Sequence, residues 1–222
     1  MDVLQQLGMY YSQNGLYVLT EFYQHFLMSA YGVFFAAIVA IPLGIVIAKH
    51  RKLSQVVFSI TNVIQTIPAL AMLALLLLVM GLGANTVIVA LFLYSILPIL
   101  RNTYVGITGI EHAYLEAGKS MGMTKFQMLW MVELPLSLSV IMAGLRTALV
   151  IAIGVTAIGT FVGAGGLGDI IVRGTNASNG TAVILAGAIP TALMAVLADL
   201  LLGRLEKWLS PIKTKKKRAR AA

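Results

Sequence analysis

The ionisable side chains inside the apolar stretches are the first candidates for chemistry in this sequence. Arg101, Arg146 and Asp199 each fall within a long run of apolar residues. A charge inside a membrane is costly, so such groups pair with each other, face a water-filled pathway or extend to the headgroups. All three lie in the same half of their predicted spans, which permits Asp199 to pair with one arginine. We favour a structural ion pair over a transport site, with extension to the headgroups as the alternative.

The sequence offers little support for catalysis. It has no cysteine, its three histidines are scattered, and no P-loop is present. Gly163, Gly165 and Gly168 spell GxGxxG, but they follow an apolar run instead of a β-strand, so the dinucleotide-binding interpretation fails. A flexible turn or a re-entrant segment is the better prediction there. We therefore predict no enzymatic activity and no metal site.

The composition indicates an all-α integral membrane protein. Of the 222 residues, 59% are hydrophobic and 11% are charged, against about a quarter charged in soluble domains. About twenty apolar residues are needed for a helix to cross the hydrocarbon core. Five runs meet this length, and the predicted spans are residues 27–48, 56–80, 86–107, 137–162 and 181–202.

The two ends of the chain differ in character. Residues 1–26 contain no Lys or Arg but many Tyr and Phe, which excludes a signal peptide and predicts an extracellular, interfacial segment. Residues 27–204 form the predicted transmembrane domain. Residues 205–222 form a basic cytoplasmic tail, predicted to contact lipid headgroups and not nucleic acid.

The distribution of basic residues predicts the orientation. With five spans, thirteen of the sixteen Lys and Arg fall on one side, against Arg173 alone on the other and two within spans. Because cytoplasmic loops are enriched in Lys and Arg, the N-terminus is predicted outside and the C-terminus in the cytoplasm.

The second and third spans carry the residues predicted to line a pathway. Gln65 and Thr66 precede Pro68, which cannot donate to the carbonyl four residues upstream. Freed backbone is tolerated in a membrane only where protein or a cavity lines it. We predict a pathway-lining kink, with a packing kink as the alternative. Tyr94 and Ser95 repeat this pattern in the third span.

The longest polar interruption, residues 111–135, is predicted to form two short helices and a turn. Gly122 is placed to end the first helix in the left-handed conformation. Thr124 and Gln127 have capping-box spacing, and Pro135 is expected to bend the chain as it re-enters the apolar phase.

This loop also resembles a family signature. Its sequence matches the EAA–x3–G–x9–I–x–LP loop of bacterial ABC importer permeases, with Gly118 in place of the second Ala and Val132 in place of Ile. In that family the loop is a cytoplasmic coupling helix that docks on the ATPase. The residues to which the resemblance gives this role are Glu116, Ala117, Gly118, Gly122, Leu134 and Pro135.

Three further stretches, residues 65–77, 97–107 and 161–174, resemble the osmoprotectant branch of the family. The resemblance covers essentially the whole transmembrane region. It implies a type I importer permease fold with five spans in a bacterial inner membrane, importing glycine betaine, carnitine or choline. A methionine or other amino-acid importer is the alternative. A secondary transporter would need midplane carboxylates, which the sequence lacks.

The resemblance also implies partners. These are cytoplasmic ATPase subunits that hold ATP and Mg, a second permease chain that is identical or homologous, and a separate extracellular binding protein. No cofactor is expected in this chain. Selectivity for a quaternary ammonium group is expected in an aromatic cage on the binding protein, because both tryptophans, Trp130 and Trp208, lie near the predicted cytoplasmic face.

Overall fold

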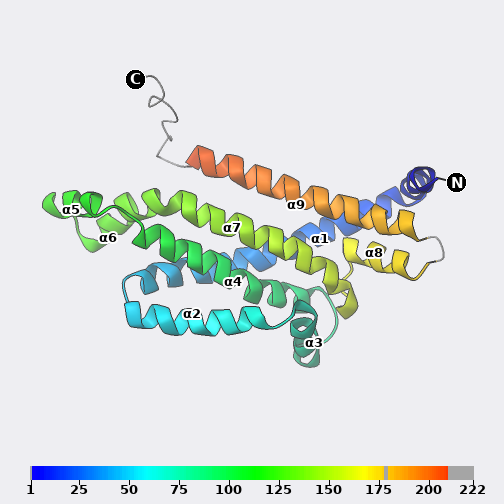
Figure 1. The fold of residues 1–222 in the computed structure, drawn as a ribbon, viewed down its shortest axis with the longest axis horizontal. Coiled ribbons are helices and arrows are strands. Elements are labelled where there is room, and N and C mark those ends of the chain that lie inside the picture. The colour runs from blue at the N-terminus through cyan, green and yellow to red at the C-terminus, as the bar shows by residue number, and fades with distance from the viewer. Residues whose placement is uncertain (1, 178–179, 210–222) are drawn as a thin grey trace, which may run out of the picture.

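The computed structural model describes residues 2–177 and 180–209, and its regular structure is helical throughout (Figure 1). The predicted all-α class is confirmed for this part of the chain. The elements are α1 (Val3–Ala48), α2 (Arg51–Thr66), α3 (Ala69–Met80), α4 (Ala84–Thr108), α5 (His112–Ser120), α6 (Lys125–Met128), a π-helical turn (Leu129–Glu133), α7 (Leu134–Thr156), a 3-10 helix (Ala157–Val162), α8 (Leu167–Thr175) and α9 (Thr181–Leu209).

The predicted spans appear as four continuous helical runs and one broken pair. Val3–Ala48, Ala84–Thr108, Lys125–Val162 and Thr181–Leu209 are each long and apolar enough to cross a membrane. Helices α2 and α3 together qualify as a fifth span, bent by 95° at the break between them. The second span is therefore broken more sharply than a simple proline kink.

Helix α1 is longer than its predicted span. It begins at Val3, so the predicted N-terminal segment and the first predicted span belong to one helix. The irregularity lies instead at Asn14, whose φ of −122° and ψ of 17° depart from helical values. The Asn14 side-chain amide donates to the Tyr10 carbonyl at 3.2 Å, a local bond of the kind that competes with helical geometry. The interfacial location of residues 1–26 stays a prediction.

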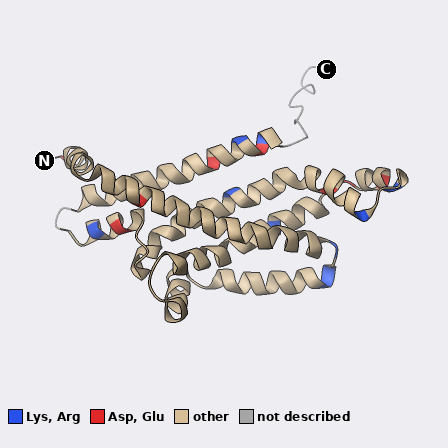
Figure 2. Cartoon of the chain, turned by 180° about the vertical axis from the view of Figure 1, so that it is seen from behind, with Lys and Arg blue, Asp and Glu red and all other residues tan. Residues whose placement is uncertain are grey.

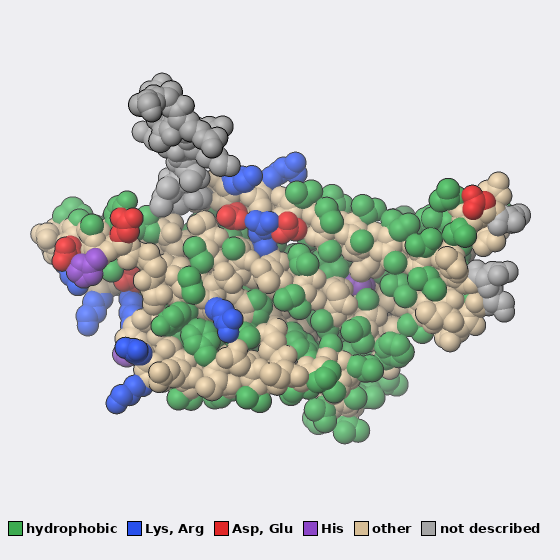
Figure 3. Space-filling model, in the orientation of Figure 1, with side chains coloured by type: hydrophobic (Ala, Val, Ile, Leu, Met, Phe, Trp, Pro, Cys, Tyr) green, Lys and Arg blue, Asp and Glu red, His purple; other side chains and the backbone are tan. Residues whose placement is uncertain are grey.

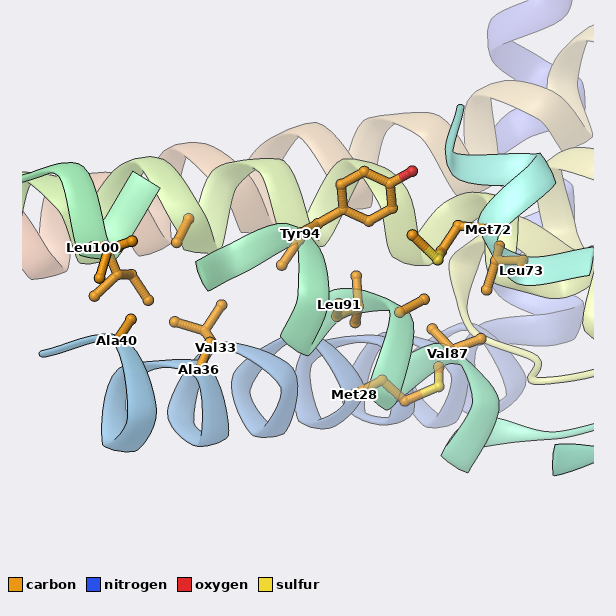
Figure 4. Packing of buried hydrophobic residues seen from close by; sticks show 14 of the residues in the cluster. Met28, Val33, Ala36, Ala40, Met72, Leu73, Val87, Leu91, Tyr94 and Leu100 are labelled. Atoms are coloured by element: carbon orange, nitrogen blue, oxygen red, sulfur yellow. The ribbon is translucent and has the colours of Figure 1, made fainter. Parts of the chain in front are cut away.

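Small residues bring α1 and α4 into close contact. Gly32, Ala36, Ala40 and Gly44 recur every fourth residue on the buried face of α1, a spacing that places them on one side of a helix. A Cβ at position 32 would lie 2.4 Å from the Leu91 Cβ. Figure 4 shows Ala36 and Ala40 facing α4 across this contact. Close packing of small residues is a main source of helix association in membranes.

The two ends of the bundle differ. Helices α5 and α6 lie at the same end as the C-terminal turns of α9, whereas α8 and the start of α1 lie at the other end (Figure 1). Charged residues gather mainly at the α5–α6 end, with a smaller group on α8 (Figure 2). Hydrophobic side chains cover the flank around α3 (Figure 3). This separation of charges toward the ends suits a helical bundle in a bilayer.

Candidate functional site

The loop at residues 111–135 folds as the predicted helical hairpin. Helix α5 ends in a Schellman arrangement, because the Gly122 N–H donates to Lys119 at 2.9 Å and the Met123 N–H donates to Gly118 at 3.1 Å. Gly122 has a φ of +77°. The Thr124 hydroxyl accepts from the Gln127 N–H while the Gln127 side chain accepts from the Thr124 N–H. The predicted turn and capping box are both confirmed.

The small residues of the hairpin have different roles. Gly118 is buried, and a Cβ there would lie 2.5 Å from the Met128 Cε, so its small size allows α5 to pack on α6. Gly122 has no atom within 4 Å of an added Cβ, so only its backbone conformation requires glycine. Glu116 is exposed and pairs with His112 at 3.1 Å. The hairpin therefore holds its shape by internal contacts and leaves Glu116 accessible.

A continuous helical segment carries the hairpin into the bundle. The chain is helical from Lys125 to Val162, so Pro135 does not interrupt the helix where the chain re-enters the apolar phase, and the expected bend there stays a prediction. Pro135 lies in the first turn of α7, directly after the π-helical turn, in which the Leu134 N–H donates to Leu129. The wider π geometry accommodates a residue that cannot donate to its upstream carbonyl. Movement of the hairpin can therefore pass directly into α7.

The hairpin is also tied to α1. Lys49, just after the end of α1, places its Nζ 2.9 Å from the Glu133 Oε2. Glu133 is nearly buried at the base of the hairpin, and a buried carboxylate needs such a partner. Sequence reasoning did not select either residue. This ion pair joins the end of the first span to the base of the hairpin.

The break between α2 and α3 brings two pathway candidates together. The Tyr94 hydroxyl donates to the Ile67 carbonyl, and the Gln65 amide donates to the Tyr94 carbonyl at 3.4 Å. The Thr66 hydroxyl bonds to Val63 within its own helix. The backbone freed near Pro68 is thus partly satisfied from α4, as irregular backbone in a membrane requires.

The five pathway candidates differ in exposure. Gln65, Thr66 and Pro68 keep accessible surface, whereas Tyr94 and Ser95 are 6% and 1% exposed. Figure 4 shows Tyr94 beside Met72 in the packed region between α3 and α4. In this conformation Tyr94 and Ser95 are buried in the packed bundle, and their place on a pathway stays a prediction.

The three intramembrane ionisable residues separate into two groups. Arg146 on α7 donates to both Asp199 oxygens at 2.9 Å and to Glu206 at 3.0 Å, both on α9. Arg101 on α4 donates to the Asn62 side-chain oxygen of α2 at 3.3 Å. Asp199 therefore pairs with Arg146 and not with Arg101. Sequence reasoning missed Glu206, seven residues after Asp199 and on the same face of α9.

A polar cluster between α1 and α8 was also missed. Here we name Tyr17, Glu21, Gly166, Asp169 and Arg173 the α1–α8 cluster. Tyr17 donates to Asp169 at 2.6 Å, Arg173 donates to Asp169 at 2.7 Å, and the Gly166 N–H donates to Glu21. The Arg173 guanidinium also lies 5.2 Å from the centre of the Tyr17 ring, within cation–π range.

The same face of α1 continues the polar contacts into the bundle. His25 is fully buried and bonds to the Ile153 carbonyl at 2.9 Å, and Ser29 bonds to Thr156 at 2.8 Å. Tyr17, Glu21, His25 and Ser29 are spaced four residues apart. This i, i+4 recurrence of polar residues in an apolar helix is the sequence signal that could have revealed the face.

The charge of Asp169 is stabilised within the cluster. Partial burial raises the pKa of Asp169, but hydrogen bonds from Tyr17 and Arg173 outweigh burial and hold the pKa below its usual value. The same bond raises the pKa of Arg173. The contact joins α1 and α8 through charged hydrogen bonds, which are stronger than neutral ones.

The GxGxxG segment has no nucleotide-binding geometry. A 3-10 helix precedes it, and Gly163 and Gly165 adopt φ values of +71° and +73° in the turn that leads into α8. A Cβ at Gly168 would lie 1.9 Å from the Ala157 carbonyl oxygen. Among residues 2–177 and 180–209, no group of three His, Cys, Asp or Glu could hold a metal ion.

The chain belongs to the family described as binding-protein-dependent transport system inner membrane components, whose sequence model matches residues 40–211. It is a permease subunit of the ABC importer class and a multi-pass inner membrane protein, and it is not itself an enzyme.

Among its relatives, the chain is 81% identical to the glycine betaine/carnitine/choline transport system permease protein OpuCD of Bacillus subtilis, over 97% of this chain and 94% of that protein. It is 76% identical to the choline transport system permease protein OpuBD of Bacillus subtilis, over 97% of this chain and 96% of that protein. It is 69% identical to the carnitine transport permease protein OpuCD of Listeria monocytogenes, over 98% of this chain and 97% of that protein.

A solved chain of the MetNI methionine ABC transporter has the same fold. Its TM-score is 0.78 at 24% identity, and the match covers 86% of this chain and 95% of that one. The predicted type I importer permease fold is therefore confirmed.

Proposed function

We propose that this chain is the permease subunit of an ATP-driven importer for osmoprotectants such as glycine betaine, carnitine and choline. The observation that carries this proposal is the 81% identity to a glycine betaine/carnitine/choline permease over nearly the full length of both chains. Methionine or another amino acid is not favoured, because the likeness to the methionine transporter, at 24% identity, concerns the fold alone.

The helical hairpin at residues 111–135, which we call the coupling hairpin, supports the assignment of an ATPase partner. It is an ordered cytoplasmic projection with accessible hydrophobic side chains at Met121, Phe126 and Trp130, which are 69%, 71% and 58% exposed. Exposed apolar groups clustered on one element mark a protein interaction site. ATP and Mg²⁺ act on the partner ATPase, and its closure moves the hairpin. The movement reaches α7 along the continuous helix and α1 through Lys49 and Glu133.

The first step of substrate selection belongs to a separate extracellular binding protein. Three relatives 69–81% identical to this chain carry names with different substrate ranges, which supports a first step of selection outside the permease. Trp130 and Trp208 lie on the coupling hairpin and on the last turns of α9, at the end of the bundle that is predicted to face the cytoplasm. Neither is placed for capture from outside. A second permease chain, identical or homologous, completes the pathway.

Uptake measurements test this function. Cells lacking their own osmoprotectant importers should, when given this permease with its ATPase and binding protein, accumulate labelled glycine betaine, carnitine or choline. Labelled methionine provides the control for the alternative substrate class. Accumulation of methionine alone would contradict the proposal.

A further inference from the structure

Arg101 is a charged residue in a membrane span for which the described residues provide no acidic partner. It is exposed on α4, and its one hydrogen bond among the described residues goes to the Asn62 side-chain oxygen at 3.3 Å. A guanidinium has five N–H donors, and Arg146 in the neighbouring span uses its donors on two carboxylates. Because an unpaired arginine in hydrocarbon is costly, Arg101 requires an anion or water on its exposed side.

Helix α2 presents a polar stripe beside Arg101. We define the α2 stripe as Gln55, Ser59, Asn62 and Thr66, all of which are exposed. Their spacing of four, three and four residues places them on one face of the helix, over a length of roughly 16 Å. A polar face of this length within a membrane span is suited to water and not to hydrocarbon.

The four residues of the α2 stripe do not give equal evidence for contact with water. The Ser59 hydroxyl bonds to Gln55 and the Thr66 hydroxyl bonds to Val63, both within α2. Hydroxyls satisfied in this way tolerate lipid. Among the described residues, no group accepts a hydrogen bond from the Asn62 amide nitrogen. Asn62 and Arg101 therefore indicate that the polar face of α2 is in contact with water.

The adjoining face of α2 is apolar. Val56, Ile60 and Val63 are 56%, 57% and 65% exposed. Each directly follows a residue of the α2 stripe in the sequence. Since successive helical residues are turned by about 100°, these side chains leave the helix in a different direction. Helix α2 thus has one face suited to lipid or protein and one suited to a water-filled pathway.

We propose that Arg101 and the α2 stripe form a contact site for the carboxylate of a zwitterionic substrate as it crosses the membrane. The inference rests on the proposed function. Glycine betaine and carnitine carry a carboxylate as well as a quaternary ammonium group, whereas choline has the ammonium group alone. Arg101 attracts the carboxylate and has no attraction for choline, so it favours passage of the first two.

Transport by the complete importer in proteoliposomes tests the site. Arg101→Gln removes the charge, and Asn62→Asp neutralises it by placing a carboxylate beside Arg101. At saturating substrate, both variants should lower the maximal rate for glycine betaine about tenfold, the factor that accompanies loss of one charge-assisted hydrogen bond. Choline uptake should stay within about twofold of wild type, because choline offers no carboxylate to Arg101.

Arg101→Lys keeps a cation and should retain more glycine betaine transport than Arg101→Gln. Arg146→Gln is the matched control, because it makes the same substitution at an arginine that is paired with carboxylates. It should lower transport of glycine betaine and of choline alike. An equal fall for both substrates in Arg101→Gln would overturn the site but leave the proposed function intact, provided that wild type transports them. If the wild type transports neither substrate, the proposed function is overturned. If the wild type transports choline alone, the carboxylate site is overturned.

Cysteine labelling tests the location of the stripe independently of substrate. The chain has no cysteine, so Ser59→Cys, Asn62→Cys, Ile60→Cys and Val63→Cys each introduce a unique thiol. In the complete importer, a water-soluble methanethiosulfonate reagent should modify positions 59 and 62 much faster than positions 60 and 63. Equal or reversed rates would place the stripe outside the pathway and overturn the proposal.

Discussion

Single residues at the turn of the coupling hairpin have separable physical requirements. Gly118 must be small because Met128 fills the adjacent space, whereas Gly122 must adopt a positive φ in open surroundings. The sequence motif presents both simply as small residues. Only the surroundings show that one glycine serves packing and the other serves the backbone.

Gly122→Val should uncouple the importer. A β-branched residue in the left-handed conformation costs at least about 1–2 kcal/mol, so α5 should lose its C-terminal arrangement. We expect normal membrane insertion, loss of substrate uptake and weaker co-purification of the ATPase. Gly122→Asn is the matched control, because asparagine tolerates this conformation, and it should keep most of the uptake. Full uptake by the valine variant would remove the coupling role of this turn.

The paired arginine is a stability element. Removing Arg146 leaves two carboxylates on α9, those of Asp199 and Glu206, without their partner on α7. Breaking a fully buried ion pair in this way costs about 3–5 kcal/mol of stability, and this partly buried pair should cost less. Arg146→Met should lower the melting temperature in detergent far more than Lys119→Met, which removes an exposed cation from α5. Similar melting temperatures for the two variants would show that the Arg146 pair contributes little.

Helical elements are joined at both ends of the bundle by polar contacts. At one end Lys49 and Glu133 join α1 to the hairpin, and at the other the α1–α8 cluster joins α1 to the segment before the last span. Helix α1 therefore contacts both regions through charge, although its middle is packed through small residues. This arrangement makes α1 the element that connects the two ends.

The α1–α8 cluster should make stability depend on acid pH. The folded-state pKa of Asp169 lies below its ordinary value of 3.8, so the stability that Asp169 contributes is present above about pH 4 and is lost as the pH falls through the folded-state pKa. Asp169→Asn should lower the melting temperature at pH 7, in keeping with a loss of about 1–3 kcal/mol for a charged hydrogen bond.

The difference in melting temperature between wild type and Asp169→Asn should become smaller below pH 4. Tyr17→Phe removes a single donor and should have a smaller effect at neutral pH, with Tyr23→Phe, exposed on the same helix, as the control. A difference that does not change with pH would exclude a charged Asp169 as the source of the stability.

At the scale of the whole molecule, the orientation in the membrane is a prediction. The α5–α6 end carries most of the described charged residues and should face the cytoplasm. Asn176, just after α8, is exposed at the other end. Asn176→Cys should react with an impermeant maleimide in intact cells, whereas Lys119→Cys on α5 should react only after the membrane is opened. Labelling of Lys119→Cys alone in intact cells would invert the orientation.

The predicted basic tail lies largely in residues 210–222, outside the described part of the chain.

The sequence alone determined the class, the membrane spans and the hairpin. These features depend on local properties, namely apolar length, cap spacing and turn residues, and the structure contains each of them. The same locality explains why the Thr124–Gln127 capping box and the turn at Gly122 were predictable residue by residue.

Tertiary structure decided which distant residues meet. It paired Asp199 with Arg146 and left Arg101 with Asn62, it buried Tyr94 and Ser95, and it joined Tyr17 to Asp169 across 152 residues. A 3.6-residue period shows that residues share a face of one helix, but not which face of another helix lies opposite it. That choice depends on how small and large side chains fit between helices, and it requires the whole bundle.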